Sequence, residues 1–275
     1  MKNTLLTFML LIILSSCERV ATVEIPATDP MPVMYSFLSP ETSVSTATIT
    51  MTAPIYGNSS SGNFETIRTA DVTISDNNGA SAKMIFDANI NSYFVNQSDF
   101  PINPGMTYTL VAKFDNYSLQ ASTTVPSLVI YLDEAIGEKL PPDPNGLDRY
   151  MIRMKWKDAP GVTNYYRVNL EEVKSNNPGD SNAFSIGDKM FSDDNKDGET
   201  MSDKFEYYDY GFGGNTPAFN AYLVNTDIHY YEYHRRRLNY FGDDPFSEPL
   251  QQYSNVKGGL GAVCSFRKTM LRVNL

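Results

Sequence analysis

The sequence predicts an all-β protein with two antiparallel β-sandwich domains and one short helix in the second domain. Short segments in which apolar and polar residues alternate recur along most of the chain, as in strands with one buried face. Turn sequences such as Asn78-Gly79 and Pro104-Gly105 separate these segments. The length of 275 residues exceeds the roughly 100–200 residues of one ordinary domain, so we expect two domains.

The composition is that of a folded, acidic protein. Lys and Arg number 22 against 32 Asp and Glu, which gives a net charge of -10 at pH 7. This surplus of negative charge disfavours binding to a phosphate backbone, so nucleic acid is not an expected partner. Hydrophobic residues make up 41% of the chain, which is enough to build buried cores. With two Cys and two His, the chain excludes a disulfide-rich scaffold.

Residues 1–16 have the features of a secretory signal peptide. Lys2 provides a basic start, and an apolar run follows over residues 5–14. A helix of that length spans about 15 Å, half of the roughly 30 Å hydrocarbon core, so a permanent membrane helix is disfavoured. The ending Leu14-Ser15-Ser16-Cys17 resembles the lipobox of bacterial lipoproteins. That resemblance implies cleavage before Cys17 and attachment of lipid, including palmitate, to this cysteine. The alternative is an ordinary signal peptide that ends near a cysteine.

Residues 17–32 are expected to form an extended tether that carries the lipid. Pro26, Pro30 and Pro32 lie there among small and polar residues. The first sandwich is predicted over residues 33–125, with an immunoglobulin- or transthyretin-like arrangement. Its strands are expected where apolar and polar residues alternate, at 47–51, 71–75, 80–87, 106–114 and 118–125.

The second sandwich is predicted over residues 126–275. Alternation places Ile152, Met154 and Trp156 on one face of a strand that follows a Pro/Gly loop. The single Trp, the Pro160-Gly161 turn and the next strand, 165–170, resemble the B and C strands of fibronectin type III domains. This resemblance covers residues 126–170 and implies that Trp156 fills the core.

One helix is predicted over residues 227–241. Asp227 is suited to cap its start, arginines at 235–237 lie in its late turns, and Gly242 follows as a stop. His229 and His234 are five residues apart and point roughly 140° apart on a helix, whereas a zinc pair needs a spacing of four. The arginines are expected either to balance the charge at the helix C-terminus or to bind a lipid phosphate or a partner carboxylate.

The best candidate for a metal site is the segment Asp193-Asp194-Asn195-Lys196-Asp197-Gly198. Oxygens of Asp193, Asn195 and Asp197 have the spacing of the first ligands in a calcium loop. Position twelve of such a loop is Lys204 where a Glu is required, and Lys196 brings a positive charge into the loop. The alternative is a polar turn rich in Asp and Asn that binds no ion.

Aromatic residues gather around the segment 205–212. Tyr207, Tyr208 and Tyr210 alternate there with acidic residues and Gly, a composition that suits a binding platform for a glycan, a peptide or a protein partner. Ordinary packing in a core or at a sheet edge is the alternative.

The sequence gives no motif for nucleophilic or nucleotide chemistry. It has neither a Gly-x-Ser-x-Gly elbow nor a phosphate loop that ends in Gly-Lys-Ser/Thr. Cys264 alternates with Ala262 and Phe266 and is expected to be a buried strand residue. The most compact acidic pairs that a carboxylate-based hydrolase would use are Asp193/Asp197 and Asp243/Asp244. An enzyme is therefore the least favoured function.

The C-terminal third contains a specific motif, Ser254-Asn255-Val256-Lys257-Gly258-Gly259-Leu260-Gly261. With residues 244–249, 35–40 and 123–126, it resembles a family of Bacteroidota lipoproteins known as domain of unknown function 4249. The resemblance implies an outer-membrane lipoprotein, often encoded beside TonB-dependent transporters, without an established activity or catalytic residues. Physically, such a glycine run lets the backbone pass where a side chain would clash, and we interpret it as a closure of the sandwich.

These observations favour a lipid-anchored, non-enzymatic interaction or accessory subunit at the outer membrane. The resemblance makes a TonB-dependent transporter the expected partner. The alternative is a surface lipoprotein that captures a glycan or a peptide with its aromatic loops and calcium. The sequence leaves open on which face of the outer membrane the protein lies.

Overall fold

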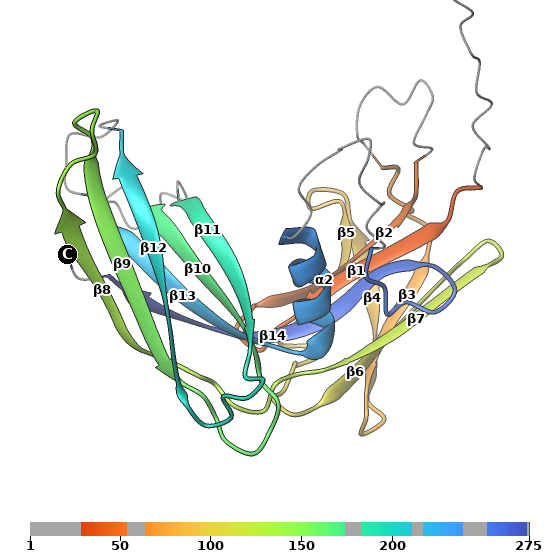
Figure 1. The fold of residues 1–275 in the computed structure, drawn as a ribbon. Coiled ribbons are helices and arrows are strands. Elements are labelled where there is room, and N and C mark those ends of the chain that lie inside the picture. Colours follow the sequence, from red (N-terminus) through yellow and green to blue (C-terminus); the bar gives the residue numbers. More distant parts are fainter. Residues whose placement is uncertain (1–28, 54–63, 174–182, 211–216, 239–251, 274) are drawn as a thin grey trace, which may run out of the picture.

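The computed structural model describes residues 29–53, 64–173, 183–210, 217–238, 252–273 and 275. Within these residues the chain forms fourteen strands and one helix, α2, so the predicted all-β class is confirmed. The strands form two lobes that diverge like the arms of a V, with α2 between them (Figure 1). None of the described residues forms a helix with the length and apolarity needed to cross a bilayer.

The first lobe contains seven strands: β1 (Pro32–Leu38), β2 (Val44–Met51), β3 (Asp71–Asp76), β4 (Ser81–Asp87), β5 (Ser92–Asn96), β6 (Thr107–Phe114) and β7 (Tyr117–Thr124). The predicted Asn-Gly turn connects β3 to β4, and Gly79 adopts a φ of 93° there, which a side chain would disfavour. Tight turns of this kind fix the register of the hairpin, so that Val72 lies opposite Met84 inside the lobe.

The second lobe contains β8 (Leu132–Leu140), β9 (Asp148–Lys157), β10 (Tyr165–Val173), β11 (Ala183–Ser192), β12 (Thr200–Asp209) and β13 (Phe219–Thr226). A three-stranded sheet in the order β12-β9-β8 packs against β10, β11 and β13. Trp156 is fully buried between these layers, with its ring edge-on to Tyr166 and Phe191. The core position expected for the single Trp is therefore observed.

The last strand, β14 (Leu260–Arg272), belongs to both lobes. Residues 260–265 pair in parallel with β1, and residues 266–272 pair antiparallel with β13. This pairing joins eleven strands into one sheet, in the order β11-β10-β13-β14-β1-β2-β5-β4-β3-β6-β7. The prediction of purely antiparallel sheets is wrong at β1 and β14. Parallel partners need a long connection, here the whole second lobe, and local alternation carries no information about such a pairing.

The two hydrophobic cores divide the chain close to the predicted boundary. The first core extends along the sequence to Val125, and the second begins at Leu132. Val256 and Val263, however, come from the predicted second domain and pack into the first core. The predicted range 126–275 thus includes a segment that folds with the first lobe.

Helix α2 (Ile228–Leu238) lies at the junction of the lobes and covers a third, smaller cluster. Tyr230 packs there on Ala262 and Cys264 of β14, with Phe37 and Phe266 beside them. Cys264 is fully buried, as the alternation predicts, and burial raises the pKa of its thiol. The expected helix residues 239–241 lie outside the described residues.

Candidate functional site

The glycine-rich motif lies where the two ends of the first lobe's sheet approach each other. Asn255 connects them through its side-chain amide. The amide nitrogen donates to the carbonyl oxygens of Ser122 on β7, at 3.3 Å, and of Val263 on β14, at 2.8 Å. The amide oxygen accepts from the Val263 N–H at 2.9 Å. Beside it, Lys257 and Gln120 exchange backbone hydrogen bonds. The Asn255 side chain thereby links β7 to β14, two strands that are not neighbours in the sheet.

The glycines that follow have neighbours too close for a side chain. A Cβ at Gly258 would lie 2.1 Å from the Ser118 carbonyl oxygen, and one at Gly261 would lie 2.0 Å from that of Met34. Gly261 also has a φ of 117°, which side chains rarely adopt. These contacts let residues 258–261 fit between β7 and β1. The geometry agrees with the interpretation of this run as a closure of the sandwich and assigns it no ligand.

A buried polar cluster lies at the junction of the lobes, beside this closure. Asp227 begins α2, and its carboxylate accepts from the Tyr230 N–H at 2.8 Å and from the Thr123 hydroxyl at 2.5 Å. Thr123 is also within 2.8 Å of Ser265 Oγ. Burial raises the pKa of the Asp227 carboxyl. The cluster ties β7, β14 and α2 together and explains why Asp227 begins the helix.

His229 and His234 lie apart on α2, as their spacing predicts. His229 Nδ1 is 2.5 Å from the hydroxyl of Tyr253. His234 stacks on Tyr230, with 4.2 Å between the ring centroids. Burial, together with the positive charges of Arg167 and Arg237, lowers the pKa of His234 to about 4. This imidazole is therefore neutral near pH 7 and contributes to packing between the lobes.

The arginines at the end of α2 make local interactions. Arg235 forms an ion pair with Glu232 at 3.0 Å, and Arg236 forms one at 3.4 Å. Arg235 also lies over the Tyr231 ring, and Arg236 over that of Tyr253. These contacts favour the first of the two expectations, that the arginines balance the helix C-terminus.

Of the predicted calcium ligands, the structure brings together the carboxylates of Asp193 and Asp197. The third carboxylate beside them is Asp158, and one oxygen of each of the three residues lies within 4.8 Å of the others. Asn195 occupies the left-handed region, with a φ of 62°, where it turns the loop. The part of Asn195 in a calcium site stays a prediction, because its φ describes the backbone of the turn and not the position of its amide oxygen.

The three carboxylates also accept hydrogen bonds that hold two loops together. Asp158 accepts from the Tyr166 hydroxyl at 2.5 Å and from the Gly198 N–H at 2.7 Å. Asp193 accepts from the Asn164 N–H, and Asp197 accepts from the Gly161 N–H, both at 2.8 Å. Asp158 and Asp193 are almost fully buried. A hard cation would find carboxylate oxygens here, but these bonds alone account for the acidic residues.

The three tyrosines proposed as a platform do not share one surface. Tyr207 and Tyr208 are neighbours in β12, a regular strand, so they point to opposite faces of the sheet. The Tyr207 ring packs against buried Phe219, at 5.0 Å between centroids, and Arg149 lies over the Tyr208 ring on the other face. Tyr210 is exposed beyond the strand end. The prediction of a joint binding site at Tyr207, Tyr208 and Tyr210 is therefore wrong.

The second lobe has two open sides, where its sheets end. On one side, Lys189 points inward from β11 and reaches β12. Its ammonium group donates to the carbonyl oxygen of Lys204 and forms an ion pair with Asp203, both at 2.7 Å, and lies 4.6 Å from the Phe205 ring centroid. An inward charge of this kind protects a sheet edge against added strands. We call this side the Lys189 flank.

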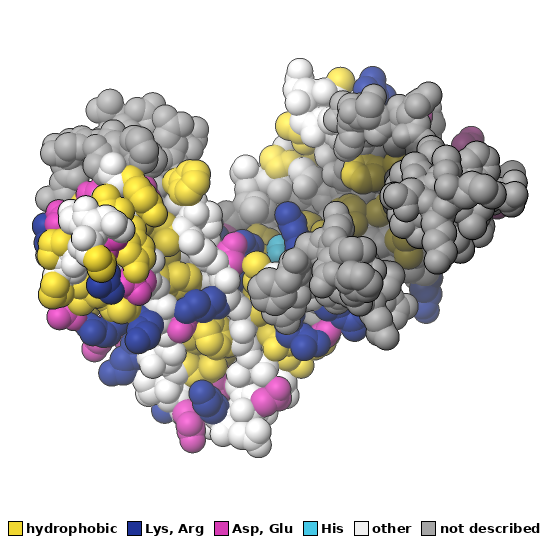
Figure 2. Space-filling view, turned by 45° about the horizontal axis from the view of Figure 1, so that its top comes forward, with side chains coloured by type: hydrophobic (Ala, Val, Ile, Leu, Met, Phe, Trp, Pro, Cys, Tyr) yellow, Lys and Arg dark blue, Asp and Glu magenta, His cyan; other side chains and the backbone are white. Residues whose placement is uncertain are grey.

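On the other side, between β8 and β14, apolar side chains are exposed. Thr269 of β14 donates its hydroxyl to the carbonyl oxygen of Ile130, and Leu275 packs on Gly137 of β8. The chain segments along this side, which we call the β14 flank, contain exposed large apolar residues: Leu128, Tyr131, Leu271 and Leu275. Ile136 and Met270 are also exposed, but alternation places them on the opposite faces of β8 and β14. Tyr131 is the most exposed of these residues, at 67%. Figure 2 shows apolar side chains exposed on this lobe among Lys and Arg side chains.

A model of the family described as "Domain of unknown function (DUF4249)" matches residues 18–272, which span both lobes and all of β14. The chain belongs to the DUF4249 family. The resemblance carried by the Ser254–Gly261 motif is thereby confirmed. A search among curated proteins gives no match.

Two parts of this DUF4249 chain were missed by sequence reasoning. Asp158 was not identified, although an acidic residue before an Ala-Pro-Gly turn is a signal for a loop-pinning carboxylate. The β14 flank was missed because Leu271 looks like an alternating strand residue on a buried face. Among the described residues, no strand pairs with residues 266–272 on the side away from β13, so the exposure of this segment is a property of the topology. Cys17, Asp243 and Asp244 lie outside the described residues.

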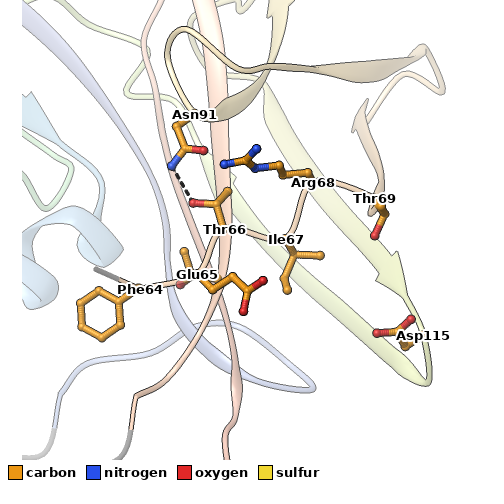
Figure 3. A pocket seen from close by; sticks show the side chains of 9 residues that line it. Phe64, Glu65, Thr66, Ile67, Arg68, Thr69, Asn91 and Asp115 are labelled. Atoms are coloured by element: carbon orange, nitrogen blue, oxygen red, sulfur yellow. Dashed lines mark hydrogen bonds between the residues drawn. The ribbon is translucent and has the colours of Figure 1, made fainter. Parts of the chain in front are cut away.

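A surface hollow of about 890 Å³ adjoins the segment 64–69 of the first lobe (Figure 3). Arg68, Glu65, Asn91 and Asp115 border it, and the Asn91 amide donates to the Thr66 hydroxyl at 2.7 Å. Asp115 lies at the tip of the β6–β7 turn, far from the side chains on Asn91's side of the hollow in this view. The polar groups that border the hollow do not converge on one point, so the hollow has no evident ligand.

Proposed function

We propose that this DUF4249 protein is anchored to the outer membrane through a lipid on Cys17 and acts as a non-enzymatic interaction subunit. The lipobox-like ending Leu14–Cys17 supports the anchor, since several acyl chains bind a membrane stably. The first strand, β1, begins at Pro32, so the tether predicted at 17–32 would lead from the lipid directly into the first lobe. Both lobes would then stand outside the bilayer.

The observation that carries the interaction role is the β14 flank. Large apolar side chains that are exposed on one side of a protein are a feature of surfaces that bind another protein or a membrane. Tyr, which is enriched in the centres of protein interfaces, is present there as Tyr131. Lys268 and Arg272 bring positive charge to the same strand, where Lys268 lies over the Tyr222 ring and Arg272 donates to Asn220.

A TonB-dependent transporter is the partner that we propose. Support for this choice comes from the family resemblance, which places such lipoproteins beside genes for these transporters. A lipid-anchored subunit meets a membrane-embedded partner in two dimensions, so a modest interface would suffice for a stable complex.

The proposal is tested by extraction of the native lipoprotein from its membrane in mild detergent, followed by affinity purification and mass spectrometry. We expect a membrane protein to co-purify in a fixed ratio, and we expect a lipid-modified peptide that begins at Cys17. A C17A variant should be released from the membrane and should lose the partner. Repeated recovery of the lipidated protein alone would contradict the interaction role.

Calcium binding is a second candidate, favoured by the convergence of Asp158, Asp193 and Asp197. Calcium at a hundred times its Kd would stabilise the protein by about 2.7 kcal/mol and raise its Tm. Melting curves in millimolar calcium and in chelator, with D193N as the control, measure this effect. Identical curves would eliminate the candidate.

A further inference from the structure

The edge of β14 that faces away from β13 has a strand partner over only half of its length. β1 pairs with residues 260–265 and ends at Leu38, opposite Ser265. Among the described residues, no strand pairs with residues 266–272 on that side. Arg267 forms an ion pair with Glu41 from the β1–β2 turn, so the accessible part of this edge is Lys268–Arg272.

The hydrogen-bond register shows which backbone groups are available there. The Val273 N–H donates to the Phe219 carbonyl oxygen, and the Asp227 N–H donates to that of Ser265, both at 3.0 Å. In an antiparallel pair every second residue is hydrogen-bonded to its partner, so residues 267, 269 and 271 also point toward β13. The N–H and C=O groups of Lys268, Met270 and Arg272 therefore point to the unpaired edge.

Apolar side chains border this edge on the side toward β8. Leu271 is 37% exposed and Leu275 is 50% exposed, and Tyr131 lies next to Ile130, whose carbonyl oxygen binds Thr269. An extended strand that pairs with β14 would place alternate side chains over this apolar group. Backbone pairing would supply affinity and the side chains specificity, as in other cases of strand addition.

The charges on the edge determine which strand fits. A second copy of this chain would pair antiparallel about Met270 and would place Lys268 directly opposite Arg272 of its neighbour. Like charges in opposed positions destabilise a sheet, so a symmetric dimer is disfavoured. A strand with acidic residues opposite Lys268 and Arg272 would instead form two cross-strand ion pairs.

We propose that a partner protein adds an extended strand, with acidic residues two positions either side of its centre, to the free edge of β14 at Lys268–Arg272. This inference rests on the proposed interaction role and specifies where and how the partner binds. The Lys189 flank, which carries an inward charge, is excluded as the docking site.

Site-specific photocrosslinking in the full-length lipoprotein tests this docking. A benzophenone amino acid replaces Tyr131 at the rim of the β14 flank, and the cross-linked partner peptide is sequenced. We expect a single partner, cross-linked in an extended segment that contains two Asp or Glu residues four positions apart. Cross-linking to a second copy of the chain would overturn the proposal.

Two variants show whether the strand edge itself is used. M270P removes an N–H that points away from β13, so the existing ladder is kept while strand addition is blocked. K268E/R272E keeps the backbone and reverses the charge. We expect each to lower the cross-linking yield at least about tenfold, a loss of 1.4 kcal/mol or more in binding. K155E/K157E, which makes the same charge change on the outer face of β9, should leave the yield unchanged.

A melting curve of each variant verifies that it is folded. If M270P does not fold, K268E/R272E alone shows whether the strand edge binds the partner. The proposal is contradicted if both variants retain the wild-type yield. It is also contradicted if a partner co-purifies with the wild type but no cross-link forms at residue 131; in that case the proposed function survives and the docking site does not. If no partner co-purifies at all, both fail.

Discussion

The two lobes end their sheets in different ways. In the first lobe, Asn255 and the glycine-rich residues 258–261 fill the space between β7 and β14 and give backbone groups of Ser122 and Val263 a partner. In the described part of the second lobe, the two sheets are not joined at their edges. Lys189 bridges β11 and β12 on one flank, and exposed apolar residues lie along the other. The comparison teaches that the glycine-rich motif of this chain serves folding, whereas the surface that we propose for binding lies where no motif is found.

The substitution with the largest expected effect on stability disrupts the closure of the first lobe. G261A places a methyl group against the Met34 carbonyl oxygen at a φ of 117°, so β14 must move away from β1. We expect a loss of roughly 4 kcal/mol or more in the free energy of unfolding, measured by urea denaturation.

Gly79 provides the matched control for that variant. It also has a positive φ, of 93°, but a Cβ there would have no neighbour within 4 Å. G79A should therefore cost only about 1–2 kcal/mol, the strain of the left-handed conformation. Equal losses for G261A and G79A would mean that the close approach to β1 has no energetic role.

A substitution with a smaller expected effect on stability removes the side chain that bridges β7 and β14. N255A deprives the Val263 N–H and C=O of their partners, and Val263 is fully buried. Unsatisfied buried groups cost about 1–3 kcal/mol each, so we expect a loss of about 2–4 kcal/mol in urea denaturation. N145A, at an exposed turn of the second lobe, should cost less than half of this. A loss below 1 kcal/mol for N255A would contradict the bridging role.

A third effect concerns the loops of the second lobe. D158N replaces an acceptor by a donor that faces the Gly198 N–H, so one of two buried hydrogen bonds is lost. We expect a loss of about 1–3 kcal/mol. The control D194N changes a carboxylate on the same loop that, among the described residues, accepts from the Ser192 hydroxyl, and it should be close to neutral. If D158N is as stable as D194N, the carboxylate does not hold these loops together.

The smallest effect is a pH dependence at the junction of the lobes. The pKa of His234 is about 4 in the folded protein and about 6.5 when unfolded, so the unfolded chain binds more protons between these values. Stability should therefore rise with pH from 4 to 6.5 and fall on acidification. The groups that face this imidazole are Arg167, Asp188, Tyr230, Tyr233 and Arg237.

H234Q isolates this contribution from other titrating groups, such as Asp227, whose raised pKa acts in the opposite direction. We expect the variant to lose about 1–2 kcal/mol of the stability difference between pH 7 and pH 4, after allowance for partial solvent exposure. Chemical denaturation at the two pH values measures it. An unchanged difference would show that His234 does not titrate in this range.

Local patterns predicted most strands, the core Trp156 and the capped helix, because each depends on residues close together in the sequence. They did not predict the parallel pairing of β1 with β14, which depends on contacts more than 200 residues apart. Asp193 and Asp197 were identified from their spacing, whereas Asp158 joins them only through the packing of two loops. Tyr207 and Tyr208 were grouped wrongly because a strand, not a loop, sends their side chains in opposite directions.

Amide hydrogen exchange along β14 tests the contrast between a closed and an open lobe most directly. Residues 262–265 pair with β1 on one side, and on the other side Val263 binds Asn255 and Ser265 binds Asp227. Their amides should therefore exchange slowly throughout. From residue 267 onward, protection should alternate: slow at 267, 269 and 271, and fast at 268, 270 and 272, until the partner protects the latter three. Uniform protection of residues 266–272 in the isolated protein would contradict an open edge.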